Sequence, residues 1–441
     1  MKTRKAILAA VAATISGIVA FSLAGCEWFS FSGKKNRNSI SSSLGYENDM
    51  GAWLASSVAS PRSNALELYE EAKRSGAIDE SVTFMDFLRA LNDDSASLTS
   101  SLRASVAIVT NTAAGSGVIY SMQDDGETLN AYVITNYHVV YSNGGIAKNI
   151  YAFLYGDPYA VSQATLTASY VGGSADEDLA VLSMAVPQDR ADYVQSISRH
   201  VGKRDSDDVN AGEKVYAIGN PLGGGISVVS GIVAVEAEYT KMKSITGGTD
   251  PVSLLTMRID APVNHGNSGG GLFDRQGTFL GIVNGGSEQT IGDESVAIGG
   301  FGYALPANRV VSVVQSILDN AQANDSKTAY KGLLGTLEVI SSRGEFNGET
   351  NSVDIIETVV LKEVDSRSPF TTELAGKVLK KIIVTDEDGE TVVSKNILRK
   401  HEAETILYNV RKGFTLTLVF DGEEDFATAQ YTEDSHFIKV S

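Results

Sequence analysis

The chain has 441 residues, 43% of them apolar, with 36 basic and 54 acidic side chains and a net charge of −18. This length predicts two or three domains with full hydrophobic cores, and the composition excludes a disordered or fibrous protein. The acidic balance, without a matching basic stripe, argues against a nucleic-acid partner, and a single cysteine excludes an internal disulfide framework and a multi-cysteine metal site.

The first 26 residues have the charge and hydropathy plan of an export signal. Three basic residues among the first five precede the apolar run 6–24. The run ends in Leu-Ala-Gly followed by Cys26, which resembles the lipobox of bacterial lipoproteins. The resemblance implies a signal peptide over 1–25, lipidation of Cys26, and anchoring to the outer face of a bacterial membrane. An uncleaved membrane-spanning segment is the alternative.

The next regions contain no chemistry that the sequence identifies. Residues 26–63 are rich in Ser, Asn, Gly and Lys without apolar periodicity, which predicts a flexible spacer. Region 64–103 is predicted to be a short helical segment, with helices over 65–74 and 83–91. We expect it to be a small docking element.

From Ala104 the sequence consists of short runs rich in Val, Ile, Tyr and Thr, separated by Gly, Asn and Asp turns. Such runs indicate an all-β domain. The two groups of six suggest two closed six-stranded β-barrels side by side, followed by a helix after Pro306 that ends a domain over 104–325. The predicted strands are 104–109, 116–121, 131–136, 149–155, 164–171 and 179–184, then 214–219, 226–236, 252–259, 270–274, 279–284 and 300–305.

The C-terminal part is predicted to be a separate α+β module over 330–441, joined by a polar linker at 322–329. It contains strand-like segments and one helical stretch. We expect strands over 355–363, 378–385 and 414–420, and a helix over 394–410.

A glycine-rich turn, Gly266-Asn267-Ser268-Gly269-Gly270, is the sharpest chemical signal. A serine between glycines lets the backbone turn tightly, presents its Oγ, and directs successive amides at one point. That arrangement can form an oxyanion hole. A turn without catalytic function is the alternative.

Two further residues complete a candidate triad. His138 lies at the end of a predicted strand, and Asp178 precedes the buried run Leu-Ala-Val-Leu. Taken singly, they could be a core histidine and a strand cap. A serine nucleophile needs a base of near-neutral pKa, and that base needs an oriented anion. The order His, Asp, Ser on a two-barrel background therefore favours catalysis.

These segments together resemble the HtrA (Deg) family of trypsin-like serine proteases, over about 104–325. The resemblance implies a chymotrypsin/trypsin-like double barrel. The matching segments are Gly115-Ser116-Gly117-Val118-Ile119, Thr135-Asn136-Tyr137-His138-Val139, Asp178-Leu179-Ala180-Val181-Leu182, Gly219-Asn220-Pro221-Leu222-Gly223, Gly266-Asn267-Ser268-Gly269-Gly270 and Gly302-Tyr303-Ala304-Leu305-Pro306.

The resemblance implies a role for each triad residue: Ser268 is the nucleophile, His138 the general base and then acid, and Asp178 its orienter. The oxyanion hole would comprise the amides of Gly266 and Ser268, with Asn267 between them. Asp176 is the rival carboxylate to Asp178.

The chain departs from the family where it has His265 and Gly271, since proline is usual at both places. Either change could loosen the loop that forms the oxyanion hole. His265 could also be a second base, although a turn role is favoured. His200, His401 and His436 have no partners at metal-ligand spacing, so we expect neither a metal nor a cofactor.

The substrate pocket is predicted to be neutral. Trypsin-like enzymes that cut after Lys or Arg have a carboxylate six residues before the nucleophile, whereas this chain has Pro262. The remaining expected lining is Val263, Ile282, Val283 and Asn284. Burying an unpaired lysine there would be costly, which predicts cleavage after Val, Ala, Ile or Thr.

The C-terminal module resembles the PDZ domain that follows HtrA-type proteases. The implied loop that captures a peptide carboxylate is Leu333, Leu334, Gly335 and Thr336. Where such domains usually have Gly-Asp-Val-Ile, this chain has Gly-Lys-Val-Leu at 376–379. A structural module without peptide capture is the alternative.

The sequence thus predicts an exported, lipid-anchored, cofactor-independent serine endopeptidase. The family resemblance implies that its substrates are misfolded or unfolded envelope proteins and that it forms a homotrimer. The alternative is a catalytically silent chaperone or adaptor that binds peptides through the PDZ-like module.

Overall fold

The structure is a computed structural model that describes most of the chain from residue 97 onward. The chain divides into two compact units, Met1–Ala96 and Ser97–Ser441. Cys26, the signal peptide 1–25 and the spacer 26–63 lie outside the described residues and stay predictions. The described residues are 69–70, 72–76, 79, 81–85, 87, 94–95, 97–124, 129–158, 166–195, 203–291, 294–324, 326–348, 352–422, 425–432 and 434–441.

In the first unit, a small aromatic cluster joins the two predicted helical stretches. The Tyr69 ring lies 5.4 Å from the Phe84 ring and 5.5 Å from the Phe87 ring, and its hydroxyl donates to the Val82 carbonyl at 2.8 Å. Residues 69–70, 72–74, 84–85 and 87 are helical. Nowhere in the described part of the chain is a helix long and apolar enough to cross a membrane.

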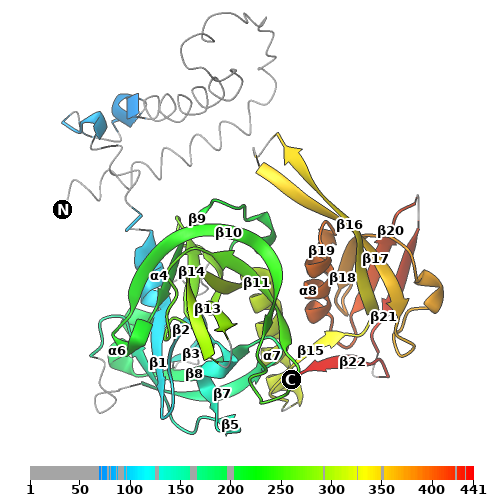
Figure 1. The fold of residues 1–441 in the computed structure, drawn as a ribbon, viewed down its shortest axis with the longest axis horizontal. Helices are drawn as coiled ribbons and strands as arrows, with labels where there is room; N and C mark the ends of the chain where they lie inside the picture. The colour runs from blue at the N-terminus through cyan, green and yellow to red at the C-terminus, as the bar shows by residue number, and fades with distance from the viewer. Residues whose placement is uncertain are drawn as a thin grey trace, which may run out of the picture. The chain divides into compact units, whose positions relative to one another are not determined.

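The first barrel of the second unit is closed, in the strand order β1-β2-β3-β8-β7-β6 (Figure 1). Its interior is a continuous apolar core in which Ile108, Val133 and Leu182 are fully buried. The strands are β1 (Ser105–Thr110), β2 (Ala114–Asp124), β3 (Leu129–Thr135), β6 (Ile150–Leu154), β7 (Leu166–Ser174) and β8 (Leu179–Val186).

Shorter elements accompany this barrel. Helix α4 (Leu98–Ala104) precedes β1, and its Ser101 hydroxyl donates to the Gly277 carbonyl at 2.9 Å. The barrel unit therefore begins before the predicted start at 104. The others are α5 (Tyr137–Val140), the two-residue strands β4 (Tyr141–Ser142) and β5 (Gly145–Ile146), and α6 (Gln188–Gln195).

The second barrel is also closed, in the order β10-β11-β14-β13-β12-β9. Three of its strands, β10, β13 and β14, are longer than the predicted runs. The strands are β9 (Lys214–Gly219), β10 (Ser227–Met242), β11 (Val252–Ile259), β12 (Gly271–Asp274), β13 (Phe279–Ile291) and β14 (Glu294–Pro306).

Helix α7 (Ala307–Asn324) follows the barrels and extends into the predicted linker. Val310, Val314 and Ile317 recur at helical spacing and are fully buried. The same core also contains Tyr408 and Val440 from the end of the chain. Most apolar side chains of the C-terminal part form a second core of their own, which includes Leu337, Ile382 and Leu418. The expectation of a separate module over 330–441 stays a prediction, and the helix replaces the first part of the predicted polar linker.

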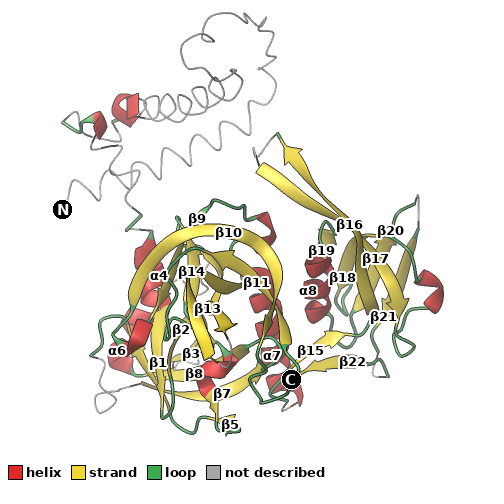
Figure 2. Cartoon of the chain, viewed as in Figure 1, coloured by secondary structure: helices red, strands yellow, loops and turns green. Residues whose placement is uncertain are grey.

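The C-terminal module combines antiparallel sheets with the α-helix α8 (Figure 2). Two pairs, β15 with β22 and β16 with β17, accompany a four-stranded sheet in the order β19-β18-β20-β21. The elements are β15 (Ala329–Gly332), β16 (Gly335–Asn347), β17 (Ser352–Val364), β18 (Leu379–Thr385), β19 (Thr391–Asn396), α8 (Lys400–Ile406), β20 (Thr415–Phe420), β21 (Phe426–Gln430) and β22 (Phe437–Val440).

The predicted helix over 394–410 is wrong at its start, since 391–396 form strand β19. A turn with Gly389 at φ +83° returns the chain beside β18, and Thr391, Val392 and Val393 are β-branched residues that suit a strand. The helix begins only after Leu398, whose amide donates to the Glu402 carboxylate at 2.7 Å. A 3-10 turn, η5 (Leu407–Asn409), follows α8.

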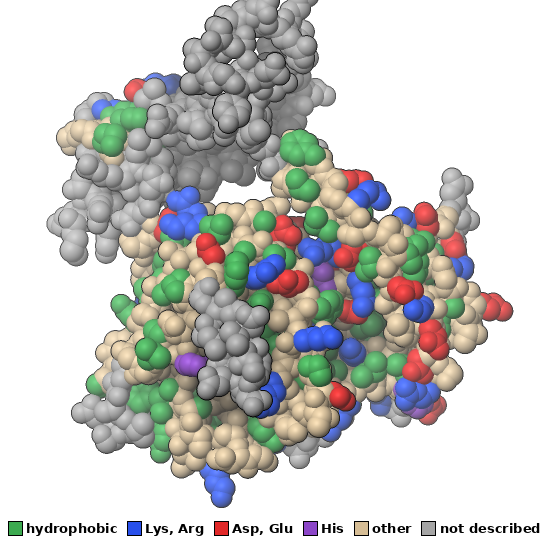
Figure 3. Space-filling model, in the orientation of Figure 1, with side chains coloured by type: hydrophobic (Ala, Val, Ile, Leu, Met, Phe, Trp, Pro, Cys, Tyr) green, Lys and Arg blue, Asp and Glu red, His purple; other side chains and the backbone are tan. Residues whose placement is uncertain are grey.

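Charged side chains are unevenly distributed on the face shown in Figure 3. Acidic and basic groups are interspersed over the C-terminal module, whereas the barrel part of that face is mainly uncharged.

Candidate active site

His138 and Asp178 come together at the edge of the first barrel. His138 lies on α5, directly after β3, and Asp178 ends the turn 175–178 between β7 and β8. The imidazole Nδ1 lies 2.7 Å from Asp178 Oδ2, and the His138 backbone amide donates to Asp178 Oδ1 at 3.0 Å. With Nδ1 as the donor, Nε2 is left as the basic nitrogen.

Asp178 is buried and sits in an uncommon backbone conformation, at φ +48°. Its carbonyl accepts from Asn136 Nδ2 at 2.8 Å, and its Oδ2 accepts from Asn284 Nδ2 at 2.5 Å. The carboxylate thus has three hydrogen-bond partners, the His138 amide, His138 Nδ1 and Asn284 Nδ2. The sequence analysis assigned no such role to Asn136 or Asn284. The one sequence feature that could have indicated it is that each asparagine follows a buried apolar run.

The carboxylate sets the ionisation of His138. Burial alone would lower the pKa of the imidazole, but the charge and hydrogen bond of Asp178 outweigh it and hold the pKa above its ordinary value of about 6.5. The folded state therefore favours the imidazolium. This stabilises the protein below about pH 6.5, and the contribution is lost as pH rises through the raised pKa.

Ser268 lies beside this pair, in a loop between β11 and β12. A Cβ placed on Gly269 would lie 3.1 Å from the Asn136 amide, and the Ser268 carbonyl accepts from the Ser116 amide at 2.8 Å. The Ser268 hydroxyl donates to the Asn284 carbonyl at 3.0 Å. Among the described residues there is no hydrogen bond between Ser268 and His138.

Two backbone amides in the Ser268 loop donate no hydrogen bond to a described residue. Within the described part of the chain, the amides of Gly266 and Ser268 have no hydrogen-bond acceptor. The Asn267 amide, in contrast, donates to the Asn264 carbonyl at 3.0 Å. Of the three residues predicted for the oxyanion hole, Gly266 and Ser268 therefore have available donors, whereas Asn267 connects them.

Contacts across the barrels fix this loop despite the missing prolines. The His265 carbonyl accepts from the Leu222 amide at 2.7 Å, and the Gly266 carbonyl accepts from the Ser116 hydroxyl at 2.6 Å. A trans peptide whose carbonyl points to Leu222 points its Gly266 amide the other way. His265 is exposed and contributes its backbone, so the expected loosening does not occur in this structure.

Neighbouring atoms leave no room for a side chain at Gly266 or Gly271. Gly266 has φ +95°, and a Cβ there would lie 2.2 Å from the Asn220 carbonyl oxygen. A Cβ on Gly271 would lie 2.3 Å from the Phe273 ring. A side chain at either position would force its surroundings to shift. At Gly271 this explains glycine where the family usually has proline.

The residues predicted to line the substrate pocket differ in exposure. Pro262 is exposed and Val263 is half-buried, so both stay predicted pocket residues. Ile282 and Val283 have no exposed area and belong to the barrel cores, because successive strand residues point to opposite sides. Asn284 is also buried, and its amide is bonded to Asp178.

Other sequence-predicted groups lie apart from the triad. Asp176, the rival carboxylate, accepts from the Ser441 amide at 3.1 Å. His401 lies 3.2 Å from Asp207. In the predicted carboxylate loop, Leu333 and Leu334 are buried, and Gly335 and Thr336 pair with β17, so peptide capture stays a prediction. The described residues contain no cluster of three or more His, Cys, Asp or Glu side chains suited to a metal ion.

Comparison with known proteins agrees with this geometry. A family model described as a trypsin-like peptidase domain matches residues 115–282, which include His138, Asp178 and Ser268. The serine protease Do-like HtrA of Lactococcus lactis is 26% identical over 333 residues, covering 74% of this chain and 72% of that protein. The serine protease Do-like HtrA of Bacillus subtilis is 30% identical over 312 residues, covering 69% of this chain but only 59% of that protein.

Among solved structures, an HtrA-type protease AlgW with tripeptide is 22% identical and covers 77% of this chain and 97% of that one, with a TM-score of 0.43. The identification rests on the family model and the curated relatives. The chain is a serine endopeptidase with a trypsin-like fold, as its sequence predicted. It belongs to the HtrA family of serine proteases.

The raised pKa of His138 predicts how activity depends on pH. Because the imidazole must be neutral to accept a proton, kcat/KM should fall tenfold per pH unit below the pKa, with the midpoint of this acid limb above pH 6.5. Hydrolysis of a neutral peptide substrate at constant ionic strength measures the limb. A midpoint below pH 6.5 would contradict the assigned environment of His138.

Proposed function

We propose that this endopeptidase cleaves unfolded polypeptides outside the cytoplasm by acyl-enzyme catalysis with Ser268, His138 and Asp178. The observation that carries the proposal is the hydrogen-bonded His138–Asp178 pair beside a serine whose loop offers two unused amides. A nucleophile, an oriented base and oxyanion donors are the parts that acyl transfer requires.

The reaction follows from these positions. Ser268 Oγ rotates from the Asn284 carbonyl toward His138 Nε2, gives it a proton and attacks the scissile carbonyl carbon. The amides of Gly266 and Ser268 donate to the resulting oxyanion. His138 then protonates the departing amine as the C–N bond breaks, and water hydrolyses the ester by the same steps in reverse.

Unfolded chains are the proposed substrates, because a protease must hold an extended segment across the triad, and folded proteins rarely offer one. Relatives are described as serine proteases of the Do-like HtrA type and as a probable periplasmic serine protease. An envelope location, a lipid anchor at Cys26 and a homotrimer are parts of this proposal. The C-terminal module, with α8 beside antiparallel strands, is proposed to be PDZ-like.

The pocket is proposed to accept small aliphatic side chains. Neither 262–268 nor 282–287 contains a carboxylate, and both the exposed Pro262 and the half-buried Val263 are apolar. An unpaired lysine or arginine buried there would lose several kcal/mol of hydration.

Loss of the nucleophile is the direct test of the proposed function. Ser268→Ala should lower the rate of casein digestion by about 10⁴-fold or more, since triad members act as a unit. The change removes one oxygen, so thermal unfolding should be nearly unchanged and serves as the control. Residual digestion above about a tenth of wild type would reject the assignment.

Digestion of an unfolded substrate by the wild-type protein also tests the predicted specificity for the residue before the cut. Mass spectrometry of products from a reduced, unfolded substrate should show a ranked spread of cuts after Val, Ala, Ile and Thr, since an apolar pocket separates such residues by only about 1–3 kcal/mol. A majority of cuts after Lys or Arg would refute the neutral pocket while leaving the triad intact.

Anchoring is tested through the single cysteine. If Cys26 is lipidated, the full chain expressed in a bacterium should partition into detergent, and Cys26→Ser should move it to the aqueous phase, because each buried methylene contributes about 0.8 kcal/mol. Wild-type protein that stays aqueous and has no lipid mass would exclude the anchor.

A further inference from the structure

Two of the four residues in the turn that carries Asp178 form hydrogen bonds with the C-terminal module, Asp176 with Ser441 and Glu177 with Tyr408. The turn comprises Ala175, Asp176, Glu177 and Asp178, between β7 and β8. Asp178 adopts a left-handed φ of +48°, a conformation that is sterically unfavourable for a non-glycine residue. Such a conformation persists only where contacts with the surrounding structure hold it in place. Those contacts therefore also determine where the Asp178 carboxylate points.

Glu177, one residue before Asp178, is the main point of contact. Its side chain is about nine-tenths buried, and its Oε1 accepts from Arg309 Nη1 at 2.9 Å and from the Tyr408 hydroxyl at 2.6 Å. Arg309 lies on α7, whereas Tyr408 lies in η5, just after α8. The carboxylate therefore connects the catalytic turn to both the helix behind the barrels and the C-terminal module.

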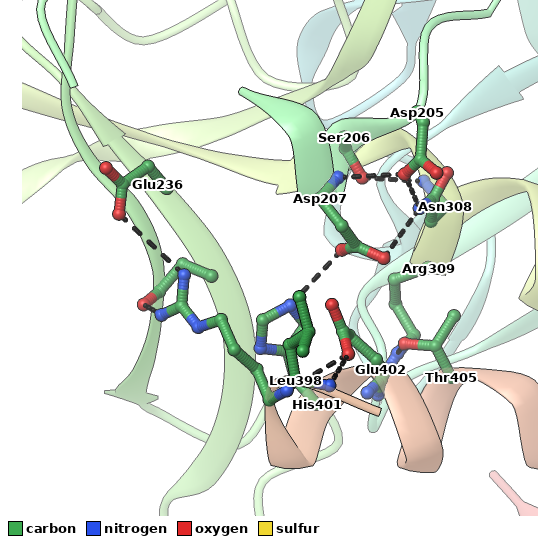
Figure 4. A network of polar contacts seen from close by, with 12 residues as sticks. Asp205, Ser206, Asp207, Glu236, Asn308, Arg309, Leu398, His401, Glu402 and Thr405 are labelled. Carbon is green, nitrogen blue, oxygen red and sulfur yellow. Dashed lines mark hydrogen bonds and ion pairs between the residues drawn. The ribbon is translucent and has the colours of Figure 1, made fainter. Parts of the chain in front are cut away.

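Arg309 is itself fixed by the module. Its Nε donates to the Thr405 hydroxyl on α8 at 2.9 Å, as Figure 4 shows, and its guanidinium lies 5.4 Å from the centre of the Tyr408 ring. The nearby charged groups are Lys331 and Glu404, and the Tyr239 hydroxyl donates to Glu404. Burial and the Glu177 charge raise the pKa of the Tyr408 phenol well above its usual value, so it stays a donor at working pH.

Helix α8, which precedes Tyr408, is anchored to the second barrel at two other places. Asp207 pairs with His401 at 3.2 Å and also with Lys395, and Arg399 lies 3.7 Å from Glu236 (Figure 4). The segment that carries Tyr408 is therefore held by contacts with Asp207 and Glu236 as well as by the bond to Glu177.

The neighbouring residue of the turn is contacted independently. The Asp176 amide donates to the Ser441 carbonyl at 2.7 Å, and the Ser441 amide donates back to Asp176 Oδ2 at 3.1 Å. The Ser174 hydroxyl donates to the same carbonyl and accepts from the Glu177 amide. Backbone and side chain of the turn are thus both bound to the C-terminal module.

Stability alone does not explain a buried ion pair at this place. Taking Glu177 and Arg309 out of water removes much of the gain from their attraction, and apolar replacements of such pairs are often neutral or stabilising. What the pair does supply is a defined position, because two directional bonds to one carboxylate oxygen restrict it more than apolar packing would.

We propose that Tyr408 and Arg309 are positioning residues of the triad, which bind Glu177 and thereby hold the adjacent Asp178 in the conformation that aims its carboxylate at His138. The C-terminal module is then a structural part of the active site in its own chain. This inference rests on the proposed function of the triad, and neither residue is assigned a contact with substrate.

A specific consequence separates positioning from general stabilisation. If the Glu177 contacts weaken, Asp178 aligns less well with His138, and the imidazole loses part of the charge and hydrogen bond that raise its pKa. The acid limb of kcat should then move to lower pH while kcat itself falls. KM should be unchanged, because the contacts with the substrate are not altered.

Tyr408→Phe in the full chain is the test, since it removes one hydroxyl and keeps the ring. We expect kcat to fall about 3- to 10-fold, KM to stay within twofold, and the acid limb to move down by roughly half a pH unit. The His138 Nδ1 proton resonance, measured by NMR, should move upfield as its bond to Asp178 lengthens. Thr405→Val, which removes the acceptor of Arg309 Nε, should act in the same direction and substitutes for Tyr408→Phe if that variant does not fold.

Tyr431→Phe is the matched control. Tyr431 is equally buried in the same module, and its hydroxyl makes one hydrogen bond, to the Leu333 carbonyl at 2.9 Å. It should lower the unfolding temperature by a similar amount and leave the acid limb and the Nδ1 proton in place.

The outcomes distinguish this inference from the proposed function. An unchanged acid limb and Nδ1 resonance in folded Tyr408→Phe, or an equal shift in Tyr431→Phe, would overturn the positioning role while Ser268→Ala remains inactive. Activity that survives in Ser268→Ala would instead reject the triad itself.

Discussion

The hydrogen bond between His138 and the buried carboxylate of Asp178 is the interaction on which the rest of the site depends. It selects the tautomer that leaves Nε2 free, raises the pKa of the imidazole and fixes the ring beside Ser268. The carboxylate can act in this way only because Asn136, Asn284 and the His138 amide all donate to its residue. A second barrel is needed for this arrangement, since Asn284 and Ser268 come from it.

The loop around Ser268 shows how the two barrels cooperate. Ser116 on β2 of the first barrel contacts the Gly266 and Ser268 carbonyls, and Leu222 beside the second barrel binds the His265 carbonyl. These contacts engage the three carbonyls and leave the Gly266 and Ser268 amides without an acceptor among the described residues. In the proposed mechanism, the oxyanion donors are therefore in place before the reaction, which limits the reorganisation that it requires.

Much of this was predictable from the sequence, because β-strand alternation and glycine-rich turns are local signals. The barrel strands follow from such patterns, and the proposed triad residues and oxyanion amides follow from them together with the family resemblance. The burial of Ile282 and Val283 in two different cores, the role of Asn284, and strand β19 in place of a helical start depend on pairing with distant strands. No short window of sequence contains that information.

The C-terminal module illustrates the same limit. Its strand-like segments suggested a separate module, and most of its apolar residues do form a core of their own. The contacts of Tyr408 and Val440 with the core of the first barrel, and the bond between Tyr408 and Glu177 across 231 residues of sequence, were not foreseen. A tyrosine in a short 3-10 turn has no local signature of contact with a catalytic turn. Only the fold reveals that the module and the triad are connected.

Covalent labelling with an organophosphate tests the central claim most directly, since diisopropyl fluorophosphate reacts with a serine only where a base and oxyanion donors activate it. The account predicts one adduct by intact mass, located on Ser268 by peptide mapping, with loss of fluoride, a labelling rate that falls below the His138 pKa, and no adduct in His138→Ala. Labelling of a different serine, or labelling of Ser268 that is unaffected by His138→Ala, would contradict it.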